Sequence, residues 1–208
     1  MIVLSHRGYW QKADEKNGRI AFERTFNLQF GTETDVRDAN RELVISHDIP
    51  TGSELRLTDV LHLLAGRDLP LALNIKADGL GKMLQALMPK TLSRWFTFDM
   101  SVPEMVFQLR VGIPVFTRAS EYERDPVCYG EAIGVWLDAF DSEWYDEEDV
   151  SSFLFDGKQV CIVSSELHRR EPAPLWTMLR RSRLKDHPNL MICTDRPEEA
   201  AAYFGSVS

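Results

Sequence analysis

The sequence is poor in the features that mark several large classes of protein. Its 208 residues carry 24 Lys and Arg against 32 Asp and Glu, a formal net charge of -8, and no Lys/Arg-rich run of the kind that tracks a nucleic-acid backbone. Because proteins that bind a nucleic-acid backbone need clustered positive charge, this composition argues against DNA or RNA as a partner. No stretch approaches the roughly 18 apolar residues that cross a bilayer, so we expect no membrane span.

Cysteine is also scarce. The three cysteines, Cys128, Cys161 and Cys193, are widely spaced and form no CxxC pair. An odd count without such a pair fits a reducing compartment and predicts no disulfide framework. Cys161 and Cys193 lie within apolar runs, which predicts that both are small core residues. The first residues lack the length and charged flank of a signal peptide, so we expect a cytoplasmic protein.

Glycine-rich phosphate loops are missing as well. Neither GxGxxG nor a Walker-type loop follows any predicted strand, which argues against nucleotide binding. What the chain has is apolar residues, which make up 44% of the sequence. That is enough for one sizeable core, and we find no internal repeat or linker. We therefore expect one domain over residues 1–208.

Short apolar runs alternate with helical patterns along most of the chain. Eight runs are predicted as the main strands, at residues 2–5, 32–36, 70–76, 95–99, 115–118, 132–137, 160–164 and 190–194. Regular alternation of strand and helix is typical of parallel βαβ units, and eight units predict a closed (β/α)8 TIM barrel. The length lies near the lower end for that fold, and the alternative is an open doubly wound sheet.

Three local expectations accompany this fold. Residues 43–46 follow a polar turn and are expected to pair back on the second strand as a hairpin. A helix is predicted over about 20–30, with Gly31 as its C-cap. A further helix is predicted over 172–184, with its basic end at the negative end of the helix dipole.

The chemistry-bearing residues gather at the predicted strand ends. Glu33 and Asp35 are two apart in a strand, so both side chains point to the same side. Adjacent carboxylates repel each other unless a cation lies between them, which indicates a divalent metal site; the alternative is a solvated strand face. Asn74 follows on another strand and offers an amide oxygen. Such all-oxygen ligands suit Mg²⁺, Ca²⁺ or Mn²⁺ better than zinc.

Two cationic residues and two histidines also lie at the ends of predicted strands. Arg7 and Lys76, together with a metal, would present three positive centres suited to a phosphate or phosphodiester. His6 and His47 supply a candidate general acid and base near neutral pH. Each histidine alone has a structural interpretation, His6 as a hydrogen-bonded strand end and His47 as a turn cap with Asp48.

Later strand ends carry further candidates. Trp136 is a candidate for stacking on a substrate, although aromatic residues at strand ends more often serve in packing. Glu166 is a candidate substrate-binding residue beyond the seventh predicted strand. Further polar residues at such ends are Asp99, Arg118, Asp138, His168 and Asp195.

Four ordered blocks resemble one known family. His6–Arg7–Gly8, Glu23–Arg24–Thr25, Glu33–Thr34–Asp35–Val36 and His47–Asp48 are similar to the HRG, PENT, ExDV and HD blocks of the glycerophosphodiester phosphodiesterases, relatives of the phosphatidylinositol-specific phospholipases C. The dense match covers about the first quarter of the chain. The resemblance implies a (β/α)8 barrel, a divalent metal and hydrolysis of a glycerol-type phosphodiester.

The resemblance also implies roles. By position it assigns His6 and His47 to acid–base catalysis, Arg7 to the phosphate and Glu33 and Asp35 to the metal. Lys76 matches the lysine of the family's ExK strand. The chain departs from the pattern at Asn74, which replaces the carboxylate of that strand, and the block at Glu23 lacks the family's proline and asparagine.

The function predicted from these features is metal-dependent hydrolysis of a glycerophosphodiester or related small-molecule phosphodiester. The metal would be Mg²⁺ or Ca²⁺, with Mn²⁺ as a further option. Two alternatives stay open: a barrel that binds a phosphorylated ligand without hydrolysing it, and a lyase that releases a cyclic phosphate. The sequence does not predict the oligomeric state.

Overall fold

The computed structural model describes residues 1–205, and the chain divides into two compact units. One unit comprises residues 5–115, and the other comprises residues 1–4 with the chain from 116 onward. Strand β1 (Ile2–His6) begins in the second of these units and ends in the first. Within the described residues, strands and helices mostly alternate along the chain, as the sequence predicted.

The unit of residues 5–115 is built on three parallel strands after β1. Its strands are hydrogen-bonded in the order β5-β4-β2, and β3 pairs antiparallel with the far part of β2. The bounds are β2 (Gly31–Ala39), β3 (Glu42–Ile45), β4 (Leu71–Ile75) and β5 (Trp95–Phe98). The helices are η1 (Ala13–Glu15), α1 (Arg19–Asn27), α2 (Leu57–Leu64), α3 (Gly81–Leu87) and α4 (Val102–Arg110).

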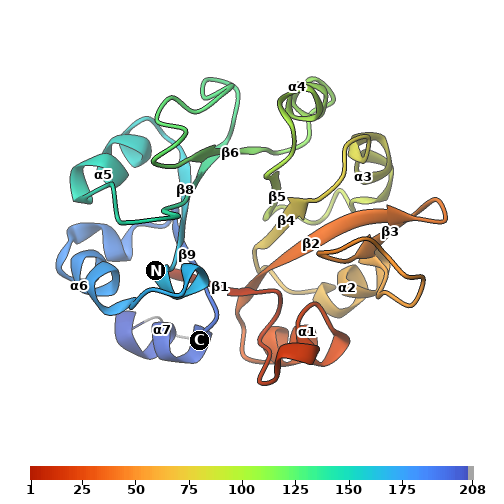
Figure 1. Ribbon diagram of the computed structural model, residues 1–208, viewed down its shortest axis with the longest axis horizontal. Helices are drawn as coiled ribbons and strands as arrows, with labels where there is room; N and C mark the ends of the chain where they lie inside the picture. The colour runs from red at the N-terminus through yellow and green to blue at the C-terminus, as the bar shows by residue number, and fades with distance from the viewer. Residues whose placement is uncertain (206–208) are drawn as a thin grey trace. The chain divides into compact units, whose positions relative to one another are not determined.

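These strands are covered on both faces. All five residues of β4 are buried, as are the first six of β2. A parallel strand covered on both sides is apolar without alternation, which explains the run Leu71–Ala72–Leu73. In Figure 1 the helices α1 to α4 lie along one side of β2, β4 and β5. The buried polar residues of these strands therefore need hydrogen-bond or ion-pair partners, which lie at the strand ends.

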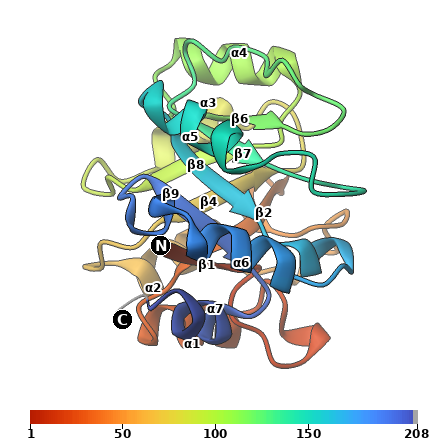
Figure 2. The same ribbon diagram turned by 90° about the vertical axis from the view of Figure 1, so that its left-hand side faces the viewer.

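The second unit repeats the same construction. Its strands β6 (Phe116–Ala119), β7 (Gly134–Leu137), β8 (Gln159–Val163) and β9 (Leu190–Thr194) are parallel and ordered β9-β8-β7-β6. Its helices are α5 (Glu147–Phe155), η2 (Ser165–His168), α6 (Ala173–Arg181), η3 (Arg183–Asp186) and α7 (Pro197–Phe204). Figure 2 shows α6 and α7 on the side of this unit that faces the viewer. Cys161 and Cys193 are fully buried in β8 and β9, which confirms the prediction that they are core residues.

Two predicted helix ends were wrong, and the β3 hairpin was confirmed. Helix α1 ends at Asn27 because Gln29 takes the left-handed conformation (φ +59°), and Gly31 enters β2 instead of capping the helix. The predicted helix over 172–184 ends at Arg181. Ser182 is extended there, and its hydroxyl accepts the Leu184 N–H to begin η3.

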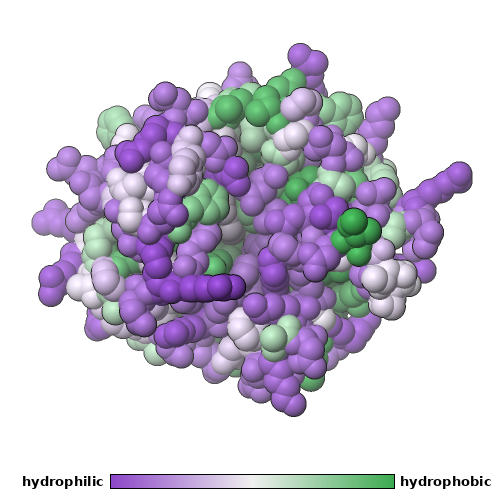
Figure 3. Space-filling model, viewed as in Figure 1, coloured by the Kyte–Doolittle hydropathy of each residue, from purple (hydrophilic) through white to green (hydrophobic). Residues whose placement is uncertain are grey.

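The surface is mostly polar. On the face seen in Figure 3, hydrophilic residues dominate and hydrophobic ones form small, separate patches. Within residues 1–205, no helix combines the length and the apolar character that a bilayer crossing requires. The scattered exposed apolar residues, such as Ile49 and Phe155, need no special explanation.

Candidate active site

The site of residues 5–115 starts at the carboxyl end of β1. Arg7 and Gly8 both take positive φ angles, +58° and +76°, so the chain turns sharply after His6. The Arg7 backbone N–H donates to the Glu33 carbonyl at 3.0 Å and lies 3.1 Å from Glu33 Oε2. This turn therefore places the Arg7 side chain beside the carboxylates of β2.

Glu33 and Asp35 point to the same side of β2, as their spacing predicted. Glu33 is 1% exposed and Asp35 is fully buried. Burying two carboxylates costs several kcal/mol unless they are paired. At Asp35 this cost is offset by ion pairs with two cations.

Two cations and an amide surround Asp35. Arg7 Nε lies 2.9 Å from Oδ2, Lys76 Nζ lies 3.4 Å from Oδ1, and Asn17 Nδ2 donates to Oδ2 at 2.8 Å. Lys76 is positioned by its own backbone N–H, which donates to the Val36 carbonyl next to Asp35. Arg7 and Lys76 are thus brought together on one buried carboxylate, with about a fifth of each side chain exposed.

Glu33 has a different environment. Burial, together with the negative charge of Asp35, raises the pKa of Glu33 to about 7, against the opposing effect of His6, Arg7 and Lys76. His6 Nε2 lies 3.9 Å from Glu33 Oε2, which places this predicted catalytic histidine beside the carboxylate pair. Asp35 is therefore paired with two cations, whereas Glu33 holds a proton more readily than a solvent-exposed glutamate does.

His47 follows the end of β3. The Ser46 N–H donates to the Asp35 carbonyl at 3.0 Å, and the His47 carbonyl accepts a hydrogen bond from Arg37 Nε at 3.2 Å, so the segment at His47 lies against β2. Its side chain is about half exposed, and Nδ1 lies 2.9 Å from Asp48 Oδ1. This hydrogen bond lowers the pKa of Asp48 and leaves Nε2 as the ring nitrogen turned away from Asp48.

The residues around Asp35 suit a hard cation with oxygen ligands. Asp35 Oδ1 and Asn74 Oδ1 are buried and, among residues 1–205, have no hydrogen-bond partner. Asp35 and Asn74 are register partners on the neighbouring strands β2 and β4. Within residues 1–205 no three His, Cys, Asp or Glu side chains are grouped to hold a metal, so a site here depends on the amide oxygen of Asn74. Carboxylate and amide oxygens fit Mg²⁺, Ca²⁺ or Mn²⁺.

A large polar pocket of about 810 Å³ adjoins this cluster. Both Arg7 and His47 line it, with segments from the β1–α1 loop and from the connection between β3 and α2. Its other charged lining residues are Asp14, Lys16, Arg19, Asp48, Glu54, Arg56 and Asp59. Such a lining suits a polar, charged ligand better than an acyl chain.

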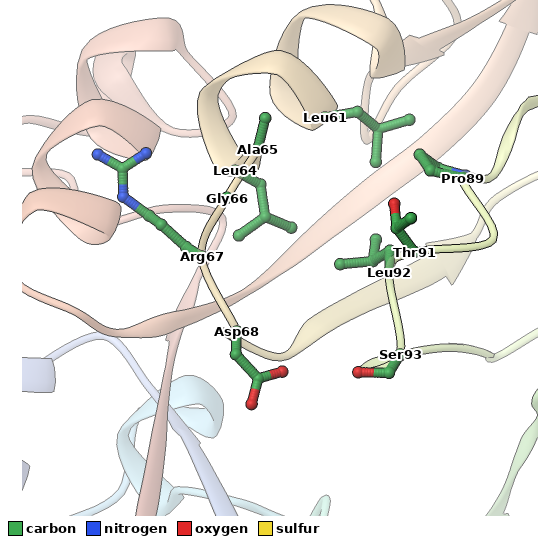
Figure 4. Close-up of a pocket in the computed structure, with 10 residues that line it drawn as sticks. All are labelled: Leu61, Leu64, Ala65, Gly66, Arg67, Asp68, Pro89, Thr91, Leu92 and Ser93. Carbon is green, nitrogen blue, oxygen red and sulfur yellow. The ribbon is translucent and has the colours of Figure 1, made fainter.

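A second pocket of the same unit has another character. It measures about 410 Å³ and is lined by the end of α2, the chain leading to β4 and the segment 89–93 before β5. Figure 4 shows the side chains of Leu61, Leu64 and Leu92 around it, while the Arg67 guanidinium points away. It lies at the amino ends of β4 and β5, whereas active sites of α/β barrels lie at the carboxyl ends, so we assign it no catalytic role.

Trp136 and Glu166 lie in the other unit. Trp136 is 4% exposed in β7. Glu166, in η2, accepts hydrogen bonds from the hydroxyls of Ser164 and Thr194 and from the Asp195 N–H, so it ties η2 to the end of β9. The substrate contacts predicted for both residues stay predictions. The same unit contains a histidine–carboxylate pair, with His168 Nε2 2.7 Å from Asp138 Oδ1.

Sequence reasoning missed Asn17. This residue has φ +59°, accepts the Thr34 hydroxyl hydrogen bond and donates to Asp35, while its backbone N–H donates to the Arg7 carbonyl. It therefore ties the β1–α1 loop to both Arg7 and Asp35. The only local signal is the Asn17–Gly18 pair, which is typical of a turn and says nothing about a carboxylate.

The block around Glu23 supports the site indirectly. Thr25 Oγ1 accepts the Tyr9 N–H at 2.7 Å, and Arg24 donates to the Tyr9 carbonyl at 2.6 Å. Glu23 itself is exposed and pairs with Arg19. The block thus holds the loop after Arg7 and Gly8, and its carboxylate faces away from the core.

Comparison with known proteins shows the fold. No protein-family model matches the sequence, and no curated protein matches it. The crystal structure of a glycerophosphodiester phosphodiesterase from Agrobacterium tumefaciens str. C58 is similar with a TM-score of 0.74, covering 99% of this chain and 100% of that chain at 15% identity. The chain therefore has the (β/α)8 barrel fold, as predicted, and the open doubly wound sheet was wrong.

Proposed function

We propose that this protein is a metal-dependent phosphodiester hydrolase that acts on a glycerophosphodiester or a related small phosphodiester. The proposal depends chiefly on one observation: Arg7 and Lys76 both contact the buried Asp35 carboxylate. Glu33 and His6 lie beside them, and a polar pocket adjoins the cluster. A phosphodiester needs charge neutralisation, a base and an acid for the leaving oxygen, and these residues supply each of them. The fold it shares with a phosphodiesterase is consistent with this chemistry.

Each residue has a role in the proposal. Arg7 lines the pocket and binds a phosphoryl oxygen through the guanidinium nitrogens not engaged by Asp35, and Lys76 adds a second positive charge. His6 and His47 transfer protons, one to the leaving alkoxide and one from the nucleophile. Asp48 holds Nδ1 of His47 and so fixes the ring.

The cation of the proposal is Mg²⁺, Ca²⁺ or Mn²⁺, held by Glu33, Asp35 and the Asn74 amide oxygen. When bound, such an ion polarises the phosphoryl oxygens and neutralises their charge. The Asn74 Oδ1, which is buried without a hydrogen-bond partner among residues 1–205, supports this assignment. Trp136 and Glu166 stay candidate substrate-binding residues of the proposal.

The proposal is tested by hydrolysis of bis(p-nitrophenyl) phosphate and of glycerophosphodiesters. We expect turnover that EDTA removes and that one of Mg²⁺, Ca²⁺ or Mn²⁺ restores. His6→Ala and His47→Ala should each lower kcat at least 100-fold, the usual contribution of a general acid or base. His62→Ala, at an exposed position of α2, is the matched control and should leave kcat unchanged.

Two results would contradict the proposal. Wild-type activity in both histidine variants, with circular dichroism showing intact folds, would remove the assigned chemistry. Binding of a phosphodiester without turnover under any ion would favour the non-hydrolytic barrel instead. The product distinguishes the remaining alternative, because a lyase releases a cyclic phosphate whereas a hydrolase releases a phosphomonoester.

A further inference from the structure

Asn74 is the one neutral residue in the predicted ligand set, and its two ends face different environments. Nδ2 donates to Asp99 Oδ2 at 3.2 Å, and Oδ1 is buried without a hydrogen-bond partner among residues 1–205. A carboxylate can only accept hydrogen bonds, so Asp99 determines which end of the amide faces it. The oxygen of Asn74 is therefore turned away from Asp99, and Asn74 itself is 8% exposed.

The strand register places Asp99 to do this. Asp35 pairs with Asn74 across β2 and β4, and Asn74 pairs with Phe98 across β4 and β5. Asp99 is the next residue after Phe98, at the carboxyl end of β5. The three polar side chains thus follow one another across three adjacent strand ends.

The backbone of Asp99 is itself unusual. Its φ is +63°, in the left-handed region that residues other than glycine adopt uncommonly. Such strained positions persist only where the surroundings hold them, and they cluster at functional sites. In this conformation the Asp99 side chain accepts the hydrogen bond from Asn74 Nδ2.

We propose that Asp99 is a positioning residue for the cation site, acting through Asn74. The Asp99 carboxylate orients the Asn74 amide so that Oδ1 is available as a metal ligand. Its negative charge also polarises the amide, which makes Oδ1 a stronger ligand for the cation. Outer partners of metal ligands act in this way and typically change metal affinity 10- to 100-fold. This inference rests on the proposed function, because it requires that the site takes a divalent cation.

The experiment measures binding of Mn²⁺ alone to the full chain by electron paramagnetic resonance titration. Asp99→Asn should weaken Mn²⁺ binding 10- to 100-fold, and because asparagine tolerates positive φ the fold should persist. Asp38→Asn removes the same charge at an exposed position of β2 and should change the affinity less than twofold. Equal Mn²⁺ affinity in Asp99→Asn and the wild type would overturn the inference.

A double-mutant cycle with Asn74→Ala tests whether Asp99 acts through the amide. With the amide removed, Asp99→Asn should have little further effect on Mn²⁺ affinity. A full additional loss in that background would show that Asp99 acts by charge alone and would overturn the positioning role.

Hydrolysis by the wild type, measured in parallel, separates the two proposals. An active wild type whose Asp99→Asn variant binds Mn²⁺ normally overturns the inference and leaves the proposed function standing. A folded wild type that binds no Mn²⁺ and has no turnover overturns both proposals.

Discussion

At the scale of single residues, Asp35 is the carboxylate on which the polar groups of the site converge. It meets Arg7, Lys76 and Asn17, which come from the β1–α1 connection and from the end of β4. Arg7, Lys76 and Asp35 together carry one net positive charge, and the raised pKa of Glu33, about 7, limits how far that carboxyl cancels it. That excess is what a phosphodiester anion needs, and it is the physical reason that the cluster favours an anionic ligand.

Glu33 leads to a prediction about pH and stability. Burial raises its pKa to about 7 in the folded protein, whereas in an unfolded chain it is about 4.3. The folded state therefore holds the proton more tightly, and the stabilising effect of that proton is lost as the pH rises between these two values. Glu33→Gln stays neutral, so its free energy of unfolding relative to the wild type should rise by up to about 3 kcal/mol from pH 5 to pH 8.

Urea unfolding at both pH values, in EDTA, measures this difference. Glu23→Gln, at an exposed position of α1, serves as the control and should show no such trend. A difference between Glu33→Gln and the wild type that is the same at pH 5 and pH 8 would show that Glu33 ionises normally in the folded protein.

At the scale of elements, the turn from β1 into α1 decides where Arg7 lies. Gly8 has φ +76°, and a Cβ built there would lie 2.7 Å from the Ala21 Cβ in α1. The turn therefore needs glycine for two reasons, a left-handed backbone and close approach to a helix. The Tyr9 N–H, next in the chain, donates to the Ala21 carbonyl at 3.1 Å, so the loop after Arg7 lies against α1.

Gly8→Ala should lower the free energy of unfolding by about 2–5 kcal/mol, roughly 1–2 from the left-handed backbone and roughly 1–3 from overpacking. Gly112→Ala is a matched control, because Gly112 has φ +78° and no atom lies within 4 Å of its added Cβ among the described residues. It should cost only the backbone part. Equal losses in the two variants, measured by chemical unfolding, would show that the contact with Ala21 is relaxed at little cost.

At the scale of the whole molecule, a bound cation should stabilise the fold. A ligand that binds only the folded state at 100 times its Kd adds about 2.7 kcal/mol. For a chain of this length that corresponds to a rise in Tm of about 5–10 °C. Thermal unfolding with EDTA and with Mg²⁺, Ca²⁺ or Mn²⁺ at matched ionic strength measures the rise.

Asp35→Asn provides the control for this effect, because it removes the central carboxylate of the proposed site. The rise should be absent in this variant. An equal rise in the variant and the wild type would place the stabilising ion elsewhere on this acidic chain, whose formal net charge is -8.

Most of the secondary structure could be predicted from the sequence because apolar runs and helical patterns are local signals. Helix α5 begins at such a local signal, since Asp146 caps it and acidic residues fill its first turn. Local signals failed where turn chemistry was ambiguous. Gly31 reads as a helix cap, yet Gln29 takes the left-handed position and Gly31 begins a buried strand.

The sequence by itself determined the alternation of strands and helices and the shared side of Glu33 and Asp35, because both follow from periodicity along one chain. Only the tertiary structure decided that Arg7, Lys76 and Asn17 meet at Asp35 and that Asp99 holds the Asn74 amide. Those contacts join residues up to 41 positions apart, as Lys76 and Asp35 show. They depend on strand register and on left-handed turns at Arg7, Asn17 and Asp99, which no local pattern of residue types specifies.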